Sequence, residues 1–209
     1  MKNFFLLLAL FLFLTKVSNA QNDQELVKQS FEKYKSSILT DKGEQAVDYV
    51  DSRTIGYYSE MADLIKGADS LQVNSLPLMD KLIVFTIRHR ATNEEILSFD
   101  GKALLVYAIQ RGMIGKNSVV STSIGEVTVN GDFAKGQFVS KGKAISIYFH
   151  FYREEGYWKI DLTSLFPNSM MAMKKIISES GQSENEYLGM ILETLTGKKP
   201  GHKIWQAIK

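Results

Sequence analysis

His150 and Asp161 are the residues of this sequence whose types and predicted positions are best suited to chemistry. A turn at Glu155-Gly156, between two stretches that alternate apolar and polar residues, predicts a hairpin in which these two side chains lie opposite each other. A carboxylate beside an imidazole fixes its tautomer and raises its basicity, as a general base requires. Tyr148 lies on the same predicted strand face as His150. The alternative interpretation is that His150 and Asp161 have no chemical role and are ordinary strand residues that face solvent or a second copy of the chain.

Arg88, His89 and Arg90 form a second candidate site, at the end of a helix predicted over residues 76–90. Three adjacent basic side chains could bind an anionic ligand. Basic residues are also expected at a helix C-terminus because they interact favourably with the helix macrodipole. The sequence favours this second explanation.

Several classes of site are excluded by what the sequence lacks. The chain has no cysteine, which excludes disulfides, a thiolate metal site and a cysteine nucleophile. Phosphate-binding glycine loops, the nucleophile elbow and the H-E-x-x-H zinc motif are missing as well. The sequence therefore predicts neither a cofactor nor a metal site.

The first 20 residues have the pattern of a secretory signal sequence. Lys2 precedes an unbroken apolar run over residues 4–14, and Ser18-Asn19-Ala20 is a typical cleavage site. The run is shorter than the about 20 residues that a membrane-spanning helix needs. We therefore expect export to the periplasm or the external medium, cleavage after Ala20, and a single domain over residues 21–209 without a transmembrane segment.

The charge of the mature chain is expected to be balanced. The whole sequence has 25 basic and 23 acidic residues, and two of the lysines, Lys2 and Lys16, lie in the predicted signal. A chain without net charge has no bulk attraction for a polyanion. Nucleic acid is therefore not an expected partner.

Helical periodicity dominates the first half of the mature sequence. The first predicted helix has an apolar stripe with the helical period, formed by Val27, Phe31, Tyr34 and Ile38. Asp41 with Glu44 predicts the capping box of a second helix. The all-apolar run over residues 82–85 predicts a central helix, with a strand as the alternative.

Residues 119–165 predict an antiparallel sheet of about four strands. Two-residue turns at Asn130-Gly131, Lys141-Gly142 and Glu155-Gly156 define its hairpins. They predict three cross-strand pairs: Val127 with Ala134, Ala134 with Phe149, and His150 with Asp161. All three turns agree on one apolar face, formed by Val127, Val129, Phe138, Ile145, Ile147, Phe149, Phe151, Trp158, Ile160 and Leu162. The predicted fold is α+β, with a helical N-terminal half packed on this curved sheet and further helices after it.

A long N-terminal helix, further helices and a strand meander that ends on Tyr157-Trp158-Lys159-Ile160-Asp161-Leu162 resemble the nuclear-transport-factor-2-like superfamily. The resemblance covers residues 24–165 and implies a curved sheet wrapped around helices. That superfamily includes isomerases, dehydratases with a His-Asp dyad, ligand binders and interaction modules. Its dehydratases hold the dyad in the concave cavity, whereas the predicted register sets His150 on the face opposite the helices.

The sequence therefore favours an exported, non-enzymatic domain that binds a small apolar ligand or a protein partner on the helix-covered side of the sheet or at a sheet edge. The alternative is a cofactor-independent lyase, isomerase or hydrolase that uses His150 and Asp161. A third interpretation is a homodimer joined through the polar face of the sheet.

Overall fold

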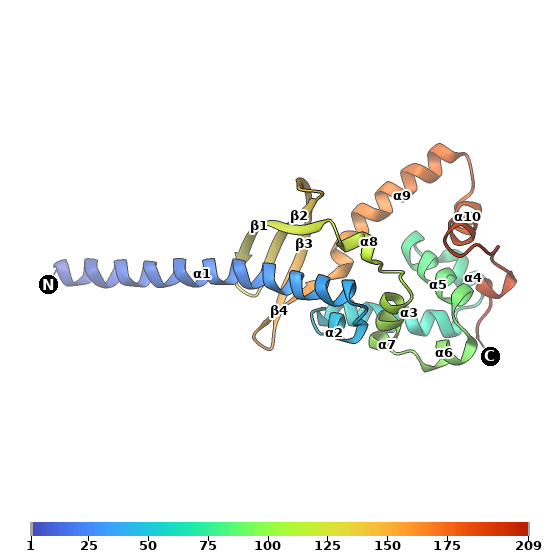
Figure 1. The fold of residues 1–209 in the computed structure, drawn as a ribbon, viewed down its shortest axis with the longest axis horizontal. Helices are drawn as coiled ribbons and strands as arrows, with labels where there is room; N and C mark the ends of the chain where they lie inside the picture. Colours follow the sequence, from blue (N-terminus) through green and yellow to red (C-terminus); the bar gives the residue numbers. More distant parts are fainter. Residues whose placement is uncertain (1, 209) are drawn as a thin grey trace. The chain divides into compact units, whose positions relative to one another are not determined.

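The computed structural model describes residues 2–208, with side chains from residue 21 onward. The predicted signal sequence and its cleavage site at Ala20 lie outside the residues whose side chains are described, so export stays a prediction. The helices and strands follow one another in the order shown in Figure 1: α1 (Lys2–Leu39), α2 (Gly43–Val47), α3 (Ser52–Gly67), α4 (Ser70–Ser75), α5 (Leu78–Arg90), α6 (Asn93–Ser98), α7 (Gly101–Gln110), α8 (Lys116–Val119), β1 (Thr122–Asn130), β2 (Phe133–Ser140), β3 (Lys143–Glu154), β4 (Tyr157–Asp161), α9 (Phe166–Ser180) and α10 (Glu184–Thr196).

The fold class is α+β, as predicted. The sheet is antiparallel and open, with the strand order β1-β2-β3-β4, and C-terminal helices follow it. Contacts divide the chain into two compact units. The first contains the residues up to Asp51 together with Gln110–Leu162, and the second contains Ser52–Ile109 and the residues from Thr163 onward. Each is described by itself below.

The β3–β4 hairpin of the first unit has the predicted register. His150 pairs with Asp161 and Phe151 with Ile160. Glu155 and Gly156 both adopt positive φ angles, 51° and 82°, which a two-residue turn of the primed type requires. The turn and the register of this hairpin are confirmed.

In the second hairpin the predicted Lys141-Gly142 turn is confirmed, with positive φ at both residues and Ser140 paired with Lys143. The first hairpin, and the second beyond its irregularity, differ from the predicted register by two residues. Ala134 pairs with Val129 on β1 and with Phe151 on β3, not with Val127 and Phe149. In the first hairpin the two loop residues are Gly131 and Asp132, and only Gly131 has a positive φ angle. This is the pattern of a type II′ turn, which needs glycine at its first central position. In the second, an irregularity between Gln137 and Val139 accommodates the longer β3.

A shift of two residues leaves every side chain on its predicted face, because the strand period is two. Phe149, Phe151, Trp158 and Ile160 are accordingly all buried. Near the β2–β3 turn the same face is open to solvent, and Ile145 is 37% exposed.

The apolar stripe of α1 covers this face of the sheet, and α1 contacts both edge strands, β1 and β4. Val27, Phe31, Tyr34 and Ile38 are all buried, as predicted. The ring centroid of Phe31 lies 5.3 Å from that of Phe149. Burial of this stripe against the sheet stabilises the first unit through the hydrophobic effect.

Asp41 ends α1 and does not cap α2, which corrects the predicted capping box. Its φ angle is 60°, and the amides of Asp41 and Lys42 donate to the carbonyls of Ile38 (3.2 Å) and Ser37 (2.9 Å). These two bonds form a Schellman motif, which an aspartate tolerates in the left-handed region. The Asp41 carboxylate pairs with Lys116 at 2.7 Å.

The second unit is built around α5. Val84, Phe85 and Ile87 are almost fully buried, and residues 82–85 are helical, which confirms the predicted central helix. Capping boxes open α6 at Thr92-Glu95 and α10 at Ser183-Glu186.

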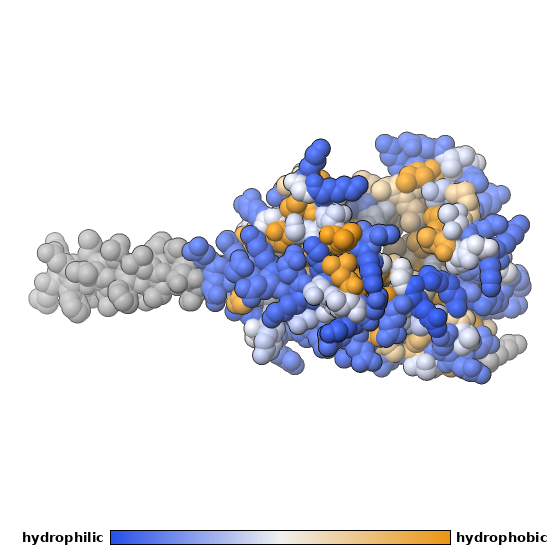
Figure 2. Space-filling model, viewed as in Figure 1, coloured by the Kyte–Doolittle hydropathy of each residue, from blue (hydrophilic) through white to orange (hydrophobic). Residues whose placement is uncertain are grey.

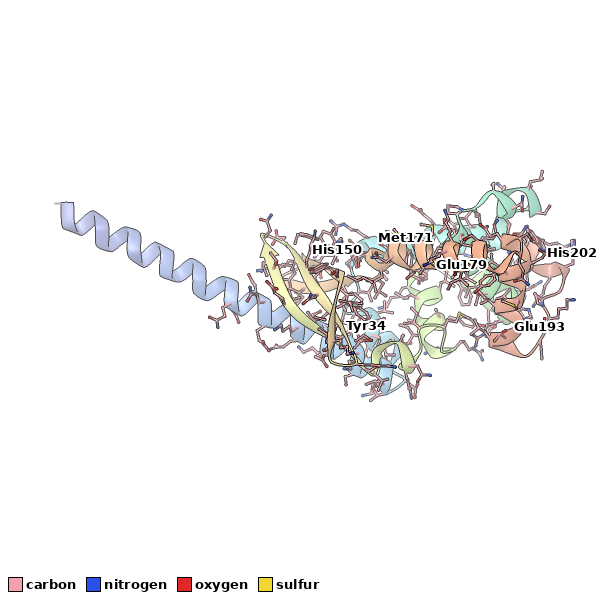
Figure 3. All side chains as sticks on the ribbon, turned by 90° about the horizontal axis from the view of Figure 1, so that it is seen from above. Tyr34, His150, Met171, Glu179, Glu193 and His202 are labelled. Carbon is pink, nitrogen blue, oxygen red and sulfur yellow. The ribbon has the colours of Figure 1, made fainter. Side chains whose placement is uncertain are left out.

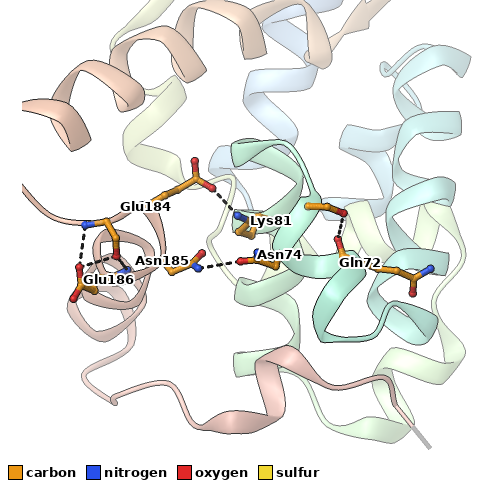
Figure 4. A network of polar contacts seen from close by, with 8 residues as sticks. Gln72, Asn74, Lys81, Glu184, Asn185 and Glu186 are labelled. Carbon is orange, nitrogen blue, oxygen red and sulfur yellow. Dashed lines mark hydrogen bonds and ion pairs between the residues drawn. The ribbon is translucent and has the colours of Figure 1, made fainter.

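Polar side chains attach the start of α10 to α4 and α5 (Figure 4). Lys81 Nζ lies 2.7 Å from Glu184 Oε1, and Asn185 Nδ2 donates to Asn74 Oδ1 at 3.2 Å. The Lys81 side chain is almost fully buried, whereas that of Glu184 is 37% exposed, so water reaches one side of this ion pair. The contacts fix where α10 begins on the surface of α5.

Candidate binding groove

A groove of about 280 Å³ lies in the first unit, where α1 passes the outer edge of β4. We call it the β4-edge groove. Its lining comes from α1 (Leu26, Gln29, Ser30, Lys33), the segment after α2 (Asp48, Tyr49), and the β3–β4 turn with β4 (Glu155, Gly156, Tyr157, Trp158, Lys159).

Hydrogen bonds fix the position of α1 and of the segment after α2 at the edge of β4. The Ser30 hydroxyl donates to the Trp158 carbonyl at 2.6 Å. The Ile160 amide donates to the Tyr49 carbonyl (2.8 Å), and the Asp51 amide donates to the Ile160 carbonyl (3.0 Å). Backbone groups two residues apart point to the same side of a strand, so we infer that the Trp158 N–H also faces this edge.

Trp158 forms a rigid wall of the groove. Its indole is buried, its Nε1 donates to Asp23 Oδ1 at 3.4 Å, and the Arg153 guanidinium carbon lies 4.6 Å from the ring centroid. Arg153 Nη2 lies 2.5 Å from the same Asp23 oxygen. The Arg153 cation over the ring and the hydrogen bond from Nε1 to Asp23 together restrict the orientation of the indole.

Two apolar side chains of the groove remain open to solvent. Leu26 is 40% exposed and Tyr157 is 72% exposed. Lys33 and Lys159 bring two positive charges and Asp48 and Glu155 two negative ones. The groove therefore offers apolar surface, a pre-positioned wall and charges of both signs.

The structure sets His150 and Asp161 opposite each other, as predicted, away from this groove. Asp161 is 7% exposed, and the His150 ring contacts the ring of Phe133 at 5.2 Å. Burial lowers the pKa of His150 below its ordinary value, Asp161 opposes that shift, and Lys135 on β2 lowers the pKa further. Tyr148 is 42% exposed on the same face. Figure 3 labels His150 on the sheet.

Arg88, His89 and Arg90 do not converge on one site. Arg88 is 1% exposed, and burial lowers its pKa to about 10. Its guanidinium donates to the backbone carbonyls of Leu64, Ile65, Ala68 and Ile204, at 2.7 to 3.2 Å. His89 Nε2 lies 2.9 Å from Thr196 Oγ1, whereas Arg90 is exposed.

The groove residues were not predicted from the sequence as a site. Leu26, Gln29, Ser30 and Lys33 have the spacing of one helix face, but this face borders the core stripe and carries no chemical motif. The only signals available were an apolar Leu26 outside the stripe and an aromatic residue directly after the Glu155-Gly156 turn.

Two features that the described residues lack bear on the type of site. No helix within them has the length and apolar content to cross a membrane. They also contain no group of three or more His, Asp or Glu side chains placed to hold a metal ion. On the face drawn in Figure 2, apolar residues form separate small patches in a largely hydrophilic surface.

Comparisons with family models, curated proteins and solved structures find no match for this chain.

Proposed function

We propose that this protein is an exported, non-enzymatic binding domain that holds a small amphipathic ligand in the β4-edge groove. The observation that carries the proposal is the exposed apolar surface of Leu26 and Tyr157 on a groove whose wall residue, Trp158, is held by hydrogen bonds of its carbonyl and of its indole N–H. The export part of the proposal depends on the predicted signal sequence.

The lining favours a ligand with an apolar body and a polar end. Exposed apolar side chains gain free energy when a ligand removes them from water, and Leu26, Tyr49 and Tyr157 lie together on this groove. Lys33 and Lys159 are matched in number by Asp48 and Glu155, so the groove does not attract a strongly charged ligand.

The groove lacks the arrangement of an acyl-transfer site. The serine in its lining is Ser30, whose hydroxyl donates to the Trp158 carbonyl at 2.6 Å. A serine nucleophile needs a general base as its hydrogen-bond acceptor, and a carbonyl oxygen is not a base of that kind. The geometry therefore supports binding.

A dye titration tests the proposal. The probe is the neutral dye N-phenyl-1-naphthylamine, which combines an apolar aromatic body with one polar N–H group. We expect saturable fluorescence enhancement with the mature chain and a dissociation constant raised at least about fivefold by Leu26→Ala with Tyr157→Ala, because about 1 kcal/mol of contact is lost.

The matched control is the double variant Leu97→Ala with Tyr148→Ala. Both residues are similarly exposed but lie outside the groove. An unchanged dissociation constant in the groove variant, or an equal loss in the control variant, would contradict the proposal. Mass spectrometry of the native protein then identifies any ligand that co-purifies with it.

A second candidate function is general-base catalysis by His150, favoured by the direct pairing of His150 with Asp161. The lowered pKa keeps the imidazole neutral at pH 7, which is the form that accepts a proton. Loss of turnover in His150→Ala, with unchanged stability, would support it once a substrate is known. Turnover that survives this substitution would exclude it.

The resemblance to the nuclear-transport-factor-2-like superfamily stays a proposal, supported by a long helix packed on an antiparallel strand meander.

A homodimer joined through the polar sheet face also stays a prediction. Sedimentation equilibrium of the mature chain tests it directly.

A further inference from the structure

The second unit contains another cavity, of about 480 Å³, formed by parts of the chain that are far apart in sequence. Its lining comes from the start of α4 (Asp69, Ser70), the first residue of α6 (Asn93), and the C-terminal tail (His202, Trp205, Gln206, Ala207). We call it the tail cavity. Figure 3 labels His202 on this tail.

The tail is attached firmly to the body of the second unit. The Trp205 ring packs on Phe85 with 4.6 Å between centroids. The Arg88 guanidinium donates to the Ile204 carbonyl at 3.2 Å, and the Ile208 amide donates to the Lys66 carbonyl at 2.8 Å. The residues of the tail that line the cavity are therefore held in place before any ligand arrives.

The polar side chains around the tail cavity are not used by the fold. Among the described residues, Ser70, Asn93, His202 and Gln206 make no side-chain hydrogen bond to another part of the chain, and neither does the indole N–H of Trp205. Asp69 is the exception, since its Oδ1 accepts from the amides of Leu71 and Gln72.

These groups both donate and accept hydrogen bonds. The amides of Asn93 and Gln206 and the hydroxyl of Ser70 can do either, and Trp205 adds a flat apolar ring beside them. The lining includes one carboxylate, Asp69, and no lysine or arginine. An anion finds no cation here, and a wholly apolar ligand would bury these polar groups without partners.

We propose that the tail cavity binds a neutral saccharide. Such a molecule has hydroxyl groups that match the amide, hydroxyl and imidazole groups, and a C–H face that packs on the Trp205 indole. A volume of about 480 Å³ is within the usual range of small-molecule sites and suits one or two sugar rings. This site is separate from the β4-edge groove and does not depend on the function proposed for it.

Saturation-transfer difference NMR on the mature wild-type chain tests this inference. The probes are glucose, N-acetylglucosamine, maltose and cellobiose at tens of millimolar, with glucuronate as the anionic comparison. We expect transfer to the ring protons of at least one neutral sugar and none to glucuronate. Absence of transfer to all four sugars would overturn the inference, as would binding of glucuronate alone.

Substitutions locate the site. Asn93→Ala with Gln206→Ala should weaken binding at least tenfold, whereas Gln182→Ala, an exposed residue away from the cavity, should leave it unchanged. Equal affinity in the double variant would contradict the assignment. Both cavity residues are exposed, so the double variant is expected to fold, and its thermal unfolding midpoint checks this.

The two tryptophans separate this test from that of the groove. The chain has only Trp158 and Trp205, so a ¹H–¹⁵N spectrum contains two indole signals, assigned with Trp205→Phe. The sugar should move the Trp205 signal, and a groove ligand should move that of Trp158. A sugar that moves only the Trp158 signal would overturn the tail-cavity assignment.

Discussion

The Ser30 hydroxyl donates a hydrogen bond of 2.6 Å to the backbone carbonyl of Trp158, which is 128 residues away in the sequence. Ser30 lies on the long N-terminal helix and Trp158 on the last strand of the sheet. This bond satisfies a carbonyl at the sheet edge and sets the distance between α1 and β4. The width of the β4-edge groove depends on it.

Ser30→Ala should therefore destabilise the protein by about 1–3 kcal/mol, because the Trp158 carbonyl is left buried without a partner. Ser36→Ala is the matched control, since Ser36 is exposed on the same helix and gains the same helix propensity. Urea denaturation followed by circular dichroism measures both variants. Equal free energies of unfolding for the two would show that the bond contributes nothing.

The pKa of His150 should lie below 6.5, because burial and Lys135 outweigh the effect of Asp161. Lys135→Ala should raise this pKa and Asp161→Asn should lower it further. NMR titration of the imidazole protons measures all three proteins, with His150→Gln to assign the signal. A pKa above 6.5 in the wild type would contradict this balance of effects and strengthen the case for a general base.

The same shift predicts how stability depends on pH. A base whose pKa is lower in the folded state binds fewer protons when folded than when unfolded. The stability that the neutral imidazole contributes is therefore fully present above pH 6.5, and it is lost as the pH falls from that value through the folded pKa. His89 has a lowered pKa as well and adds to the effect. Replacing both residues by Gln should reduce the loss of unfolding free energy as the pH falls below 6.5.

Arg88 illustrates how sequence reasoning finds a residue but not its role. The run Arg88-His89-Arg90 stood out as an anion site or as a set of charges at a helix end. In the structure Arg88 is fully buried and bonded to four carbonyls, including those of Ile65 and Ile204. Its partners come from α3 and from the tail, and no local pattern in the sequence predicts that these segments meet there.

Arg88→Leu should destabilise the protein by at least about 3 kcal/mol, because buried carbonyls at the end of α3 lose their donors. Arg88→Lys keeps the charge but lacks the planar guanidinium with its several N–H donors, so we expect an intermediate loss of unfolding free energy. Arg90→Leu, at an exposed position of the same helix, should cost no more than about 1 kcal/mol. Comparable losses in Arg88→Leu and Arg90→Leu would contradict the structural role of Arg88.

The sheet was predicted better than the helical connections, and the reason is physical. A two-residue turn and a period of two fix which face each side chain takes, even where the register of Ala134 was wrong by two residues. Asp41 shows why the helical connections were harder to predict. An aspartate can cap the start of a helix or end the preceding one, and only the backbone geometry determines which of the two it does. The β4-edge groove combines three segments, and none of them has a motif of its own.

Two glycines of the second unit provide the sharpest packing test, because their surroundings differ while the substitution is the same. Gly56 in α3 has free space where a Cβ would be, so Gly56→Ala should stabilise the protein by about 1 kcal/mol through helix propensity. Gly101 opens α7 against α3, and a Cβ there would lie 2.7 Å from the Ser59 amide nitrogen and even closer to the Ile55 carbonyl. Gly101→Ala should therefore cost about 1–3 kcal/mol. Urea denaturation of the two variants should give changes of opposite sign, and a stabilising Gly101→Ala would show that α7 and α3 are not in contact at this point.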